Sequence, residues 1–378
     1  MIVLHAAALT WGKIDGIGAA VPALIRAQHG MEGLRVALLH TGASRQPAPE
    51  LGFSVFPRRG ILGHPTRLVL PAPFDRPDLV VFHNTYIPFH AALARRLRRL
   101  GIPYVICPHG GMTRAAQRQK WFKKRLGNLL FFNRFVAHAQ ALHCLTPGEA
   151  AESDHWRRPT FVVGNGIALP DASELASPGR SAQLAIAYVG RLDMHHKGLD
   201  WLVDACGLVR AELRQRGACV QLRGPDVRRT AAKLQQRIAD HQLQETVRIL
   251  GPVVGDQKAL LLRHSDVFLH TSRWEGHPMA VLEALAYGLP CLLTPGTNLA
   301  ETVANAGAGW RVEPTPAGIA EGLRHVLRAA PCALQQAGRD ARRLAEREFR
   351  WQQVAARVVE HYRRYVQDVD RPRRQAAA

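Results

Sequence analysis

The chain has 378 residues, of which 47% are hydrophobic and 21% charged, a balance that excludes an intrinsically disordered protein. No apolar run reaches the roughly 18 to 20 residues that cross a bilayer, and the start of the chain lacks the basic flank of a signal peptide. Six scattered cysteines without a Cys-x-x-Cys pair are typical of reduced thiols in a cytoplasmic protein. The net charge of +20 is concentrated in residues 1–170, which carry 21 basic and 8 acidic residues. A field of that sign attracts nucleic acid, anionic membranes or phosphorylated substrates.

Short apolar segments alternate with amphipathic segments along the chain, which predicts an α/β fold with parallel sheets. In the first half we expect strands at 2–5, 36–39, 79–83, 104–107, 141–144 and 161–163. The helices expected between them lie at 18–27, 89–100 and 113–136. A second series of strands is expected at 185–190, 220–223, 247–250, 267–270 and 290–294. Apolar residues at a spacing of 3.6 predict a helix over 199–213 in this second series.

The segment between the two series is rich in Pro, Gly and Ser and has little apolar periodicity, which predicts an interdomain linker. We expect two Rossmann-like, doubly wound domains facing a central cleft, because such sheets bind ligands at the carboxyl ends of their strands. The predicted parts are an N-terminal domain at 1–168, a linker at 169–182, a C-terminal domain at 183–350, a helix at 351–370 that packs back on the N-terminal domain, and a disordered tail at 371–378.

The most informative stretch is 266–290, where a strand gives way to a short loop and a helix. We expect the loop to carry Glu275, Gly276 and His277. The helix should open with Pro278 at its first position, followed by Met279. Free backbone N–H groups and the helix dipole at such a start favour a phosphate group, and a glycine lets the backbone approach it closely. This stretch therefore predicts an anion-binding site.

Two carboxylates flank the predicted anion site. Glu283 lies five residues into the helix, about 7 to 8 Å along its axis, which suits a contact with the ribose hydroxyls of a nucleotide whose phosphates lie at the helix start. Glu275 would face the sugar beyond the phosphates. The spacing is also compatible with a helix that has one N-terminal acid and one solvated interior acid, without a function for either.

A second turn between a strand and a helix carries two basic residues, Arg191 and Lys197. Arginine offers forked donors and lysine a point charge, so both suit a diphosphate. Neutralising a departing nucleoside diphosphate is what glycosyl transfer requires. The chain has no Gly-x-x-x-x-Gly-Lys-Ser/Thr motif, which disfavours phosphoryl transfer by a P-loop.

Four features follow one another in the second half of the chain. They are Gly190-Arg191 with Lys197-Gly198, the run Leu250-Gly251-Pro252-Val253, the pair Glu275 and Glu283 separated by seven residues, and the run Ala284-Leu-Ala-Tyr-Gly-Leu-Pro290. Together they resemble the retaining glycosyltransferases of family 4, which have the GT-B fold. The resemblance implies that a sugar moves from a nucleoside-diphosphate donor to a glycan or lipid-linked acceptor, with retention and without a metal or another cofactor. It also implies that the N-terminal domain binds the acceptor and the C-terminal domain the nucleotide sugar.

The resemblance implies a role for each matched residue. Arg191 and Lys197 would stabilise the leaving diphosphate, Glu283 would bind the ribose and Glu275 the donor sugar. His109 follows a strand, where the family often places a histidine that faces the reacting sugar. The catalytic set is then His109, Arg191, Lys197 and Glu275.

The implied donor-binding set is wider. The run 251–253 would lie beside the base, the glycines of 15–18 would form the first loop, and Asn165-Gly166 would lie at the domain junction. His277 and Pro278 depart from the family, which more often has Phe or Leu and then Gly there. The donor-binding residues are Gly16, Gly18, Arg191, Lys197, Gly251, Pro252, Val253, Glu275, Gly276, His277, Pro278, Met279 and Glu283.

On the acceptor side, His83 and Asn84 end a predicted strand at the presumed cleft. The stretch 114–136 combines a basic cluster, which includes Lys120, Lys123 and Lys124, with aromatic and leucine residues. Such a segment can lie on an anionic membrane surface and contact acceptor phosphates, which would suit a polyprenyl-linked acceptor at the inner face of the plasma membrane. A core helix with a solvated basic face is the alternative, which is favoured for 129–135.

The 18 histidines show no metal-ligand spacing, so we expect no metal. A non-hydrolysing sugar-nucleotide epimerase shares the two-domain architecture, but it needs dedicated acid–base residues and does not predict the paired glutamates. A non-enzymatic nucleic-acid binder is suggested by charge alone. No recognised nucleic-acid module is visible, so we expect no nucleic-acid partner.

Overall fold

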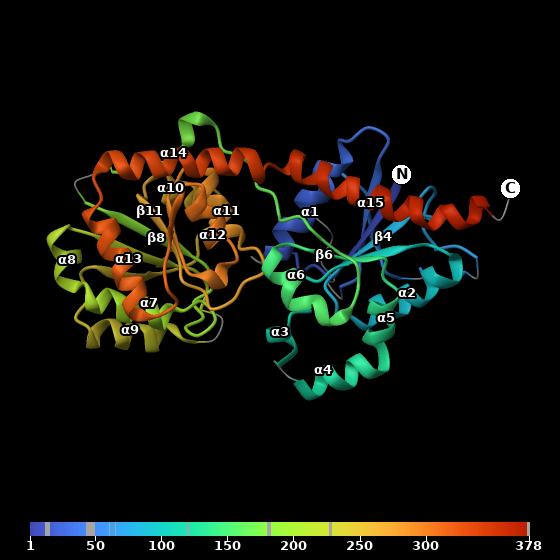
Figure 1. Cartoon of the computed structure of the whole chain (residues 1–378), viewed down its shortest axis with the longest axis horizontal. Coiled ribbons are helices and arrows are strands. Elements are labelled where there is room, and N and C mark those ends of the chain that lie inside the picture. The colour runs from blue at the N-terminus through green and yellow to red at the C-terminus, as the bar shows by residue number, and fades with distance from the viewer. Residues whose placement is uncertain are drawn as a thin grey trace. The chain divides into compact units, whose positions relative to one another are not determined.

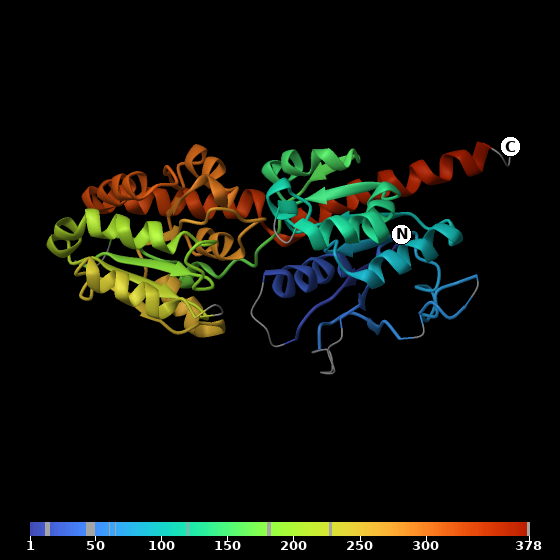
Figure 2. The same ribbon diagram turned by 90° about the horizontal axis from the view of Figure 1, so that it is seen from below.

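The computed structural model describes residues 1–11, 16–42, 50–59, 61–64, 66–118, 121–179, 183–226 and 229–375. The chain forms two compact units, the first made of 1–166 with 351–378 and the second of 167–350. Each unit has one parallel sheet with helices on both of its faces (Figures 1 and 2). The predicted α/β class with two doubly wound domains is confirmed.

The first unit has a seven-stranded sheet in the order β3-β2-β1-β4-β5-β6-β7. Its strands are β1 (Ile2–Ala7), β2 (Arg35–His40), β3 (Val55–Pro57), β4 (Leu79–His83), β5 (Tyr104–Cys107), β6 (Ala141–Cys144) and β7 (Thr160–Val162). Its helices are α1 (Gly16–His29), α2 (Pro88–Leu100), α3 (Arg114–Arg118), α4 (Trp121–Gly127), the π-helix η1 (Asn128–Phe132), α5 (Asn133–Ala137), α6 (Pro147–Ser153), the 3₁₀ turn η2 (Asp154–Trp156) and α15 (Trp351–Gln375).

The second unit has a six-stranded sheet in the order β10-β9-β8-β11-β12-β13. Its strands are β8 (Ala185–Val189), β9 (Cys219–Arg223), β10 (Val247–Leu250), β11 (Val267–His270), β12 (Cys291–Leu293) and β13 (Gly309–Arg311). Its helices are η3 (Ala172–Glu174), α7 (Leu199–Leu208), α8 (Arg210–Gln215), α9 (Ala231–Asp240), α10 (Gly255–Arg263), α11 (Met279–Ala286), η4 (Pro295–Thr297), α12 (Ala300–Asn305), α13 (Pro316–Arg328) and α14 (Pro331–Glu348).

The central strands are buried on both faces, so successive residues pack into two different cores. In β1, Leu4 and Ala6 pack with α2 and α5, whereas Val3 and Ala7 pack with α1 and α15. The apolar stripe of α15 includes Tyr362, which is fully buried. The chain therefore returns to the first unit with its last helix.

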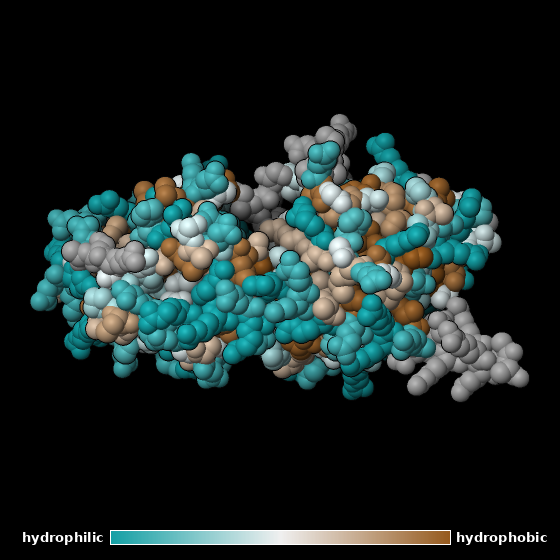
Figure 3. All heavy atoms as spheres, turned by 90° about the horizontal axis from the view of Figure 1, so that it is seen from above, coloured by the Kyte–Doolittle hydropathy of each residue, from teal (hydrophilic) through white to brown (hydrophobic). Residues whose placement is uncertain are grey.

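Helix α14 buries one stripe against α11, and Figure 3 looks onto its outer side, where hydrophilic residues predominate. Within the described residues, no helix combines the length and the apolar character that crossing a bilayer demands.

Three predicted elements differ from the structure. The helix expected over 113–136 is found as α3 and α4, with 119–120 outside the described residues, and it continues through the π-helical turn η1 into α5. The helix expected over 199–213 ends at Leu208, where the β-branched Val209 leaves the helical conformation with φ −119° and buries its side chain. Helix α15 continues to Gln375, so the backbone of 371–375, expected to be disordered, is helical.

Candidate functional site

Each sheet reverses its winding between the first and fourth strands of its unit, and the loops after those two strands diverge. Ligands of doubly wound sheets bind at this switch point. In the second unit the two strands are β8 and β11, and the loops that follow them span 190–198 and 271–278. These loops carry Arg191, Lys197 and Glu275, so the fold brings the three residues predicted to act on the donor to one edge of one sheet.

The Glu275 carboxylate is the most strongly bound group at this edge. Its Oε1 forms an ion pair with Lys197, accepts a hydrogen bond from Ser272 Oγ at 2.7 Å, and lies 3.0 Å from Nε2 of His270. The side chains of Lys197 and Glu275 are only 10% and 11% exposed. Burial alone would raise the pKa of Glu275, but the Lys197 ammonium and the His270 contact hold it well below its usual value. Glu275 is therefore ionised and matched by one buried cation.

Backbone geometry positions both members of this ion pair. Gly198 follows Lys197 with φ +62°, and a Cβ there would lie 2.1 Å from the carbonyl oxygen of Thr271, so only glycine allows this approach. The loop of Glu275 is held by Asn298, whose Nδ2 donates to the carbonyl oxygens of Glu275 at 2.7 Å and Gly276 at 3.2 Å.

Arg191 differs from Lys197 because it is exposed. Its Nη2 lies 3.2 Å from Nδ1 of His196, whose ring stacks on Trp274 and whose Nε2 donates to the Trp274 carbonyl oxygen at 2.8 Å. Gly224 supports the turn from β9, since a Cβ there would lie 1.7 Å from the carbonyl oxygen of Gly190. The guanidinium is thus held at the edge of the site with donors turned to solvent.

Pro278 is the N-cap residue of α11 rather than its first helical residue, with φ −74° and ψ 109°, so that prediction is wrong by one position. The carbonyl of the cap accepts the first helical bond, from Val281 at 3.1 Å. The amides of Met279 and Ala280 precede that bond, as expected of the free donors of a helix start. The predicted anion site keeps its backbone donors.

His277 is a donor-binding prediction that the structure places differently. Its ring is buried and lies edge-on against Phe349, with ring centroids 5.7 Å apart. Burial lowers the pKa of His277 to about 4, so the ring is neutral at pH 7. The side chain therefore contacts Phe349 of the core against which Met279 also packs.

Glu283 lies on α11 as predicted, and its Oε1 forms an ion pair at 2.5 Å with Lys258 of α10. Both side chains are partly buried. In the run after β10, Gly251 and Pro252 are exposed and Val253 is buried. Exposed backbone at this position remains able to contact a base.

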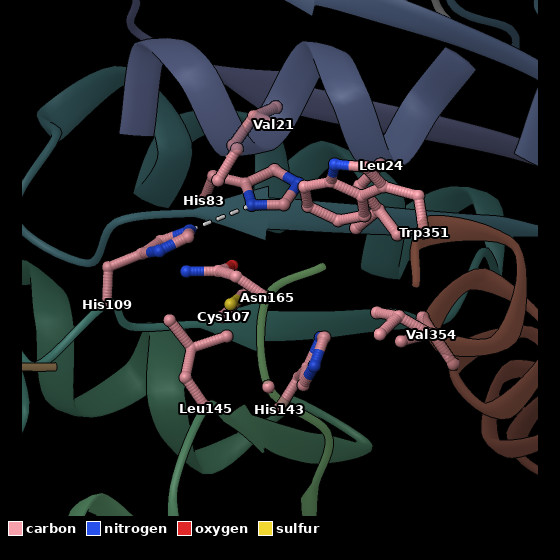
Figure 4. Close-up of a pocket in the computed structure, with 13 residues that line it drawn as sticks. Val21, Leu24, His83, Cys107, His109, His143, Leu145, Asn165, Trp351 and Val354 are labelled. Carbon is pink, nitrogen blue, oxygen red and sulfur yellow. Dashed lines mark hydrogen bonds between the residues drawn. The ribbon is translucent and has the colours of Figure 1, made fainter. Parts of the chain in front are cut away.

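The first unit has a pocket of its own on the face of the sheet that α1 and α15 cover (Figure 4). It is lined by Ala20, Val21, Leu24, His83, Cys107, His109, His143, Leu145, Gly164, Asn165, Trp351, Val354 and Val358. His109 lies at its wall in the left-handed conformation with φ 49°, and its Nε2 is 3.0 Å from Nδ1 of His83. Burial lowers the pKa of His109 to about 3, which keeps the ring neutral.

His83 is fully enclosed, and its second nitrogen, Nε2, lies 2.9 Å from Nδ1 of His5. Because neighbouring rings occupy both of its nitrogens, His83 supports His109 instead of offering itself to an acceptor. Asn84 follows with φ 72°, and its carbonyl oxygen accepts from Nδ1 of His90 at 3.2 Å.

The predicted glycine loop opens α1, with Gly16 as the first helical residue and Gly18 in the first turn, while Asp15 lies outside the described residues. Asn165 lines the pocket. A Cβ at Gly166 would lie 2.5 Å from the Trp351 ring, so the junction residue lets α15 pack closely.

The basic segment shows a mixed outcome. Lys123 is exposed, whereas the ammonium of Lys124 donates to the Ala116 carbonyl oxygen at 2.5 Å and lies 4.9 Å from the Tyr86 ring centroid. Lys124 is therefore bound within its own unit rather than presented to an acceptor phosphate. Lys120 lies outside the described residues.

Several residues of the site have no counterpart in the sequence predictions. His270, Ser272 and Asn298 surround Glu275, and Lys258 pairs with Glu283. Arg273 makes two hydrogen bonds of 2.8 Å to Asp200 and lies 3.5 Å from the centroid of the Trp201 ring, which ties the loop 271–278 to the start of α7. His270 could have been found from its position as the last residue of a predicted strand.

Among the described residues, the one cluster with metal-ligand spacing is His83, Cys107 and His109, whose ligand atoms lie within 4.8 Å of one another. The two imidazoles are hydrogen-bonded to each other, and burial raises the pKa of the Cys107 thiol well above its usual value. The two imidazoles thus bind each other, and the thiol beside them stays protonated.

Comparison with known proteins agrees with these two units. Residues 15–166 match the family model described as glycosyl transferase 4-like domain, and residues 183–329 match glycosyl transferases group 1. A glycogen synthase of Mycobacterium tuberculosis is 29% identical over 294 residues, which cover 76% of this chain and 69% of the relative. The GDP-mannose:cellobiosyl-diphosphopolyprenol alpha-mannosyltransferase of Xanthomonas campestris is 25% identical over 303 residues, 75% of this chain and 73% of the relative.

Solved structures share the fold at low sequence identity. HepE from Anabaena in complex with UDP-glucose superposes with a TM-score of 0.70 at 16% identity, covering 96% of this chain and 99% of that one. With two Rossmann-ordered sheets and both family models matched, the chain is a glycosyltransferase of the GT-B fold that belongs to the group 1, family 4 type.

Proposed function

We propose that the protein moves a sugar from a nucleoside-diphosphate donor to a glycan or lipid-linked acceptor, with retention of the anomeric configuration, in the synthesis of bacterial cell-surface polysaccharide. The observation that carries the donor assignment is the edge of the second sheet, where Arg191, the Lys197–Glu275 pair and the start of α11 meet. Similar proteins support it, since HepE forms a complex with UDP-glucose and the Xanthomonas relative is a GDP-mannose-dependent mannosyltransferase.

The charges of the site suit a departing diphosphate. Lys197 is matched by Glu275, so the exposed guanidinium of Arg191 and the amides of the α11 start supply the positive field that the phosphates require. Glu275 then remains an acceptor for donor-sugar hydroxyls. Glu283 binds the ribose, with Lys258 holding its carboxylate in place.

This arrangement supports a reaction without a metal ion or another cofactor. The bond between the anomeric carbon and the leaving phosphate oxygen breaks, and a bond from the same carbon to the acceptor oxygen forms on the same face. The acceptor proton passes to a phosphate oxygen of the donor. Arg191 and the amides of the α11 start stabilise the charge that develops on the diphosphate, and Lys197, although its charge is balanced by Glu275, adds N–H donors to the same phosphates.

The test is a thermal-shift panel of UDP-, GDP- and ADP-sugars, followed by nucleotide release with EDTA present. A ligand that binds only the folded protein raises its stability, so one base should shift the unfolding transition upward. Glu283→Ala should lower the affinity for that nucleotide about 10- to 100-fold, because it removes charged hydrogen bonds. Glu321→Ala, at an exposed position of α13, is the control. No stabilisation by any sugar nucleotide, or turnover that EDTA abolishes, would contradict the proposal.

The same assay separates transfer from epimerisation. A transferase releases the nucleoside diphosphate in proportion to the acceptor glycosylated, whereas an epimerase changes the sugar and releases none to an acceptor.

We further propose that the segment 121–131 rests on an anionic lipid surface at the inner face of the plasma membrane. Among the described residues, twelve large apolar side chains are exposed, and half of them lie in this segment: Trp121, Phe122, Leu126, Leu129, Leu130 and Phe131. Figure 1 shows α4 set apart from the sheet of its unit. Exposed Lys123 and Arg125 lie among the apolar side chains. An amphipathic surface with this charge fits anionic headgroups and would place the enzyme near a polyprenyl-linked acceptor.

Vesicle sedimentation tests this surface. Trp121→Ser with Phe122→Ser and Leu129→Ser should reduce binding to phosphatidylglycerol-containing vesicles at least about tenfold, since each buried apolar side chain contributes on the order of 1.5 kcal/mol or more. The matched control replaces three exposed apolar residues of other elements, Val69, Leu208 and Leu260, by Ser. Equal sedimentation of the two triple variants would rule the segment out.

A further inference from the structure

A continuous hydrogen-bonded chain of side chains runs through the first unit to the pocket. Oε1 of Gln28 lies 2.7 Å from Nε2 of His5, Nδ1 of His5 lies 2.9 Å from Nε2 of His83, and Nδ1 of His83 lies 3.0 Å from Nε2 of His109. Gln28 comes from α1, and the three histidines come from β1, β4 and the loop after β5. The last link is drawn as a dashed line in Figure 4.

The side chains of this hydrogen-bonded chain are uncharged, and all but His109 at the pocket are fully buried. Gln28 and His5 are 0% exposed and His83 is 1% exposed, while His109 is partly buried. Burial lowers the pKa of His5 to about 4 and that of His109 to about 3, so all three rings are neutral at pH 7. A neutral imidazole has one N–H donor and one lone pair.

Because each neutral ring has one donor and one acceptor nitrogen, the direction of the first hydrogen bond fixes the direction of all the others. Gln28 turns its carbonyl oxygen to His5 and leaves its buried amide nitrogen without a hydrogen-bond partner among the described residues. In this orientation the oxygen can only accept, so Nε2 of His5 donates and Nδ1 of His5 is left to accept. His83 must then donate from Nε2 and accept at Nδ1. His109 in turn donates from Nε2 to His83, which leaves a lone pair on its Nδ1. Within the described part of the chain, Nδ1 of His109 has no hydrogen-bond partner.

We propose that Gln28, His5 and His83 are positioning residues that hold His109 as the Nε2–H tautomer, so that His109 presents a lone pair at Nδ1 to a hydroxyl group of the substrate. A nitrogen without a proton accepts from a sugar hydroxyl and offers nothing to a phosphate oxygen, which also only accepts. The pocket of the first unit is thereby selective for hydroxyl groups, while anions are left to the second unit. The proposed function is the basis for calling this hydroxyl a sugar's, but the tautomer itself does not depend on it.

Histidine nitrogen NMR on the full chain, labelled with ¹⁵N-histidine and free of substrate, reads the tautomers directly. Two other buried histidines serve as internal references. His90 faces the Asn84 carbonyl oxygen with Nδ1, so it must be the Nδ1–H form, and His143 faces the Val163 carbonyl oxygen at 2.8 Å with Nε2, so it must be the Nε2–H form. We expect the ¹⁵N signals of the two ring nitrogens of His109 to match those of His143, the Nε2–H form. Signals that match those of His90, the Nδ1–H form, would overturn the proposal.

Gln28 variants test the origin of the tautomer. Gln28→Leu removes the terminal acceptor, so we expect His109 to populate the Nδ1–H form while His90 and His143 keep their patterns. Gln28→Glu keeps an acceptor-only oxygen and should restore the Nε2–H form. Gln117→Leu, which removes a side-chain bond to Tyr86 in the same unit, is the matched control and should change no histidine. An unchanged His109 pattern in Gln28→Leu, or a changed one in Gln28→Glu, would show that Gln28 does not set the direction.

Turnover supplies an independent readout. With the donor found by the panel, Gln28→Leu should lower kcat about tenfold and leave the KM for the donor little changed, because the donor diphosphate is bound by the second unit. Gln28→Glu should regain most of kcat. If the tautomers follow the chain as described but no sugar nucleotide is turned over, the tautomer assignment stands and the proposed function fails.

Discussion

Among single residues, Glu275 depends most on its surroundings, because Lys197, Ser272 and His270 all converge on one of its oxygens. The burial of this carboxylate is tolerable only while a cation faces it. The stability of the second unit should therefore fall when one partner of this ion pair is removed.

Lys197→Met is expected to lower the free energy of unfolding by about 3 to 5 kcal/mol at pH 7, since it leaves a buried charge unpaired. In the wild type the pKa of Glu275 is depressed, so the stability it confers is present above the usual carboxyl pKa and is lost as pH falls through the lower, folded-state pKa. In the variant the unpaired, buried carboxyl has a raised pKa, so its protonation stabilises the folded state. The difference in free energy of unfolding between wild type and variant, measured by chemical denaturation, should thus shrink between pH 7 and pH 4. Lys123→Met, at an exposed position, should change stability by less than about 0.5 kcal/mol, and an equal effect of both would contradict this account.

His277 makes a second residue-scale prediction. Its folded-state pKa is about 4 against 6.5 for the free side chain, so the unfolded chain binds the proton first and stability falls as pH drops from 6.5 to 4. At pH 5.5 this costs about 1 kcal/mol. His277→Phe should remove that part of the pH dependence between pH 7.5 and 5.5, whereas His138→Phe, at an exposed position, should not. A slope unchanged by His277→Phe would mean that the ring is not buried as described.

Site residues differ in how well the sequence predicts them. Arg191, Lys197, Glu275 and Glu283 stand in loops and helix turns whose order along the chain already implies one edge of a sheet. The partners of these residues are different, because Lys258 and Asn298 reach the site only through the packing of α10 and the loop before α12. No local pattern marks them, and the burial of His277 against Phe349 depends on the same long-range packing.

At the scale of elements, the switch-point loops of the second unit are set by close contacts between backbones. Gly224→Ala would place a Cβ 1.7 Å from the Gly190 carbonyl oxygen, so the turn that carries Arg191 must move. We expect a loss of about 1 to 3 kcal/mol in stability together with weaker sugar-nucleotide binding. Gly251→Ala, where nothing lies within 4 Å of the added Cβ, is the stability control. Equal denaturation midpoints for the two variants would refute the close approach.

Periodicity predicts most strands and helices of both sheets, since buried parallel strands are continuous apolar runs. It fails between residues 113 and 136, because aromatic and leucine residues that favour a buried stripe are exposed there instead. A helix pattern cannot distinguish a side chain that faces a core from one that faces another apolar surface. The π-helical turn η1 likewise has no sequence signal that we recognise.

At the scale of the whole molecule, the first unit is built from two separate parts of the chain. Val354, Val358, Val359 and Tyr362 of α15 are at most 1% exposed and close the face of the sheet over α1. A chain that ends at Arg350 should expose this face, bind a hydrophobic dye and aggregate. Removing only 376–378 should do neither, and a soluble, non-aggregating chain without 351–378 would contradict the role given to α15.

Helix α15 also bears on the order in which the chain matures on the ribosome. Domains usually complete their folding in the order of synthesis, with the N-terminal one first. Here the sheet that is translated first receives its covering helix last, after every residue of the second unit has been made. The newly made first unit therefore keeps an open apolar face throughout elongation, and translation must reach the final helix before that face is closed to chaperones, proteases and other nascent chains.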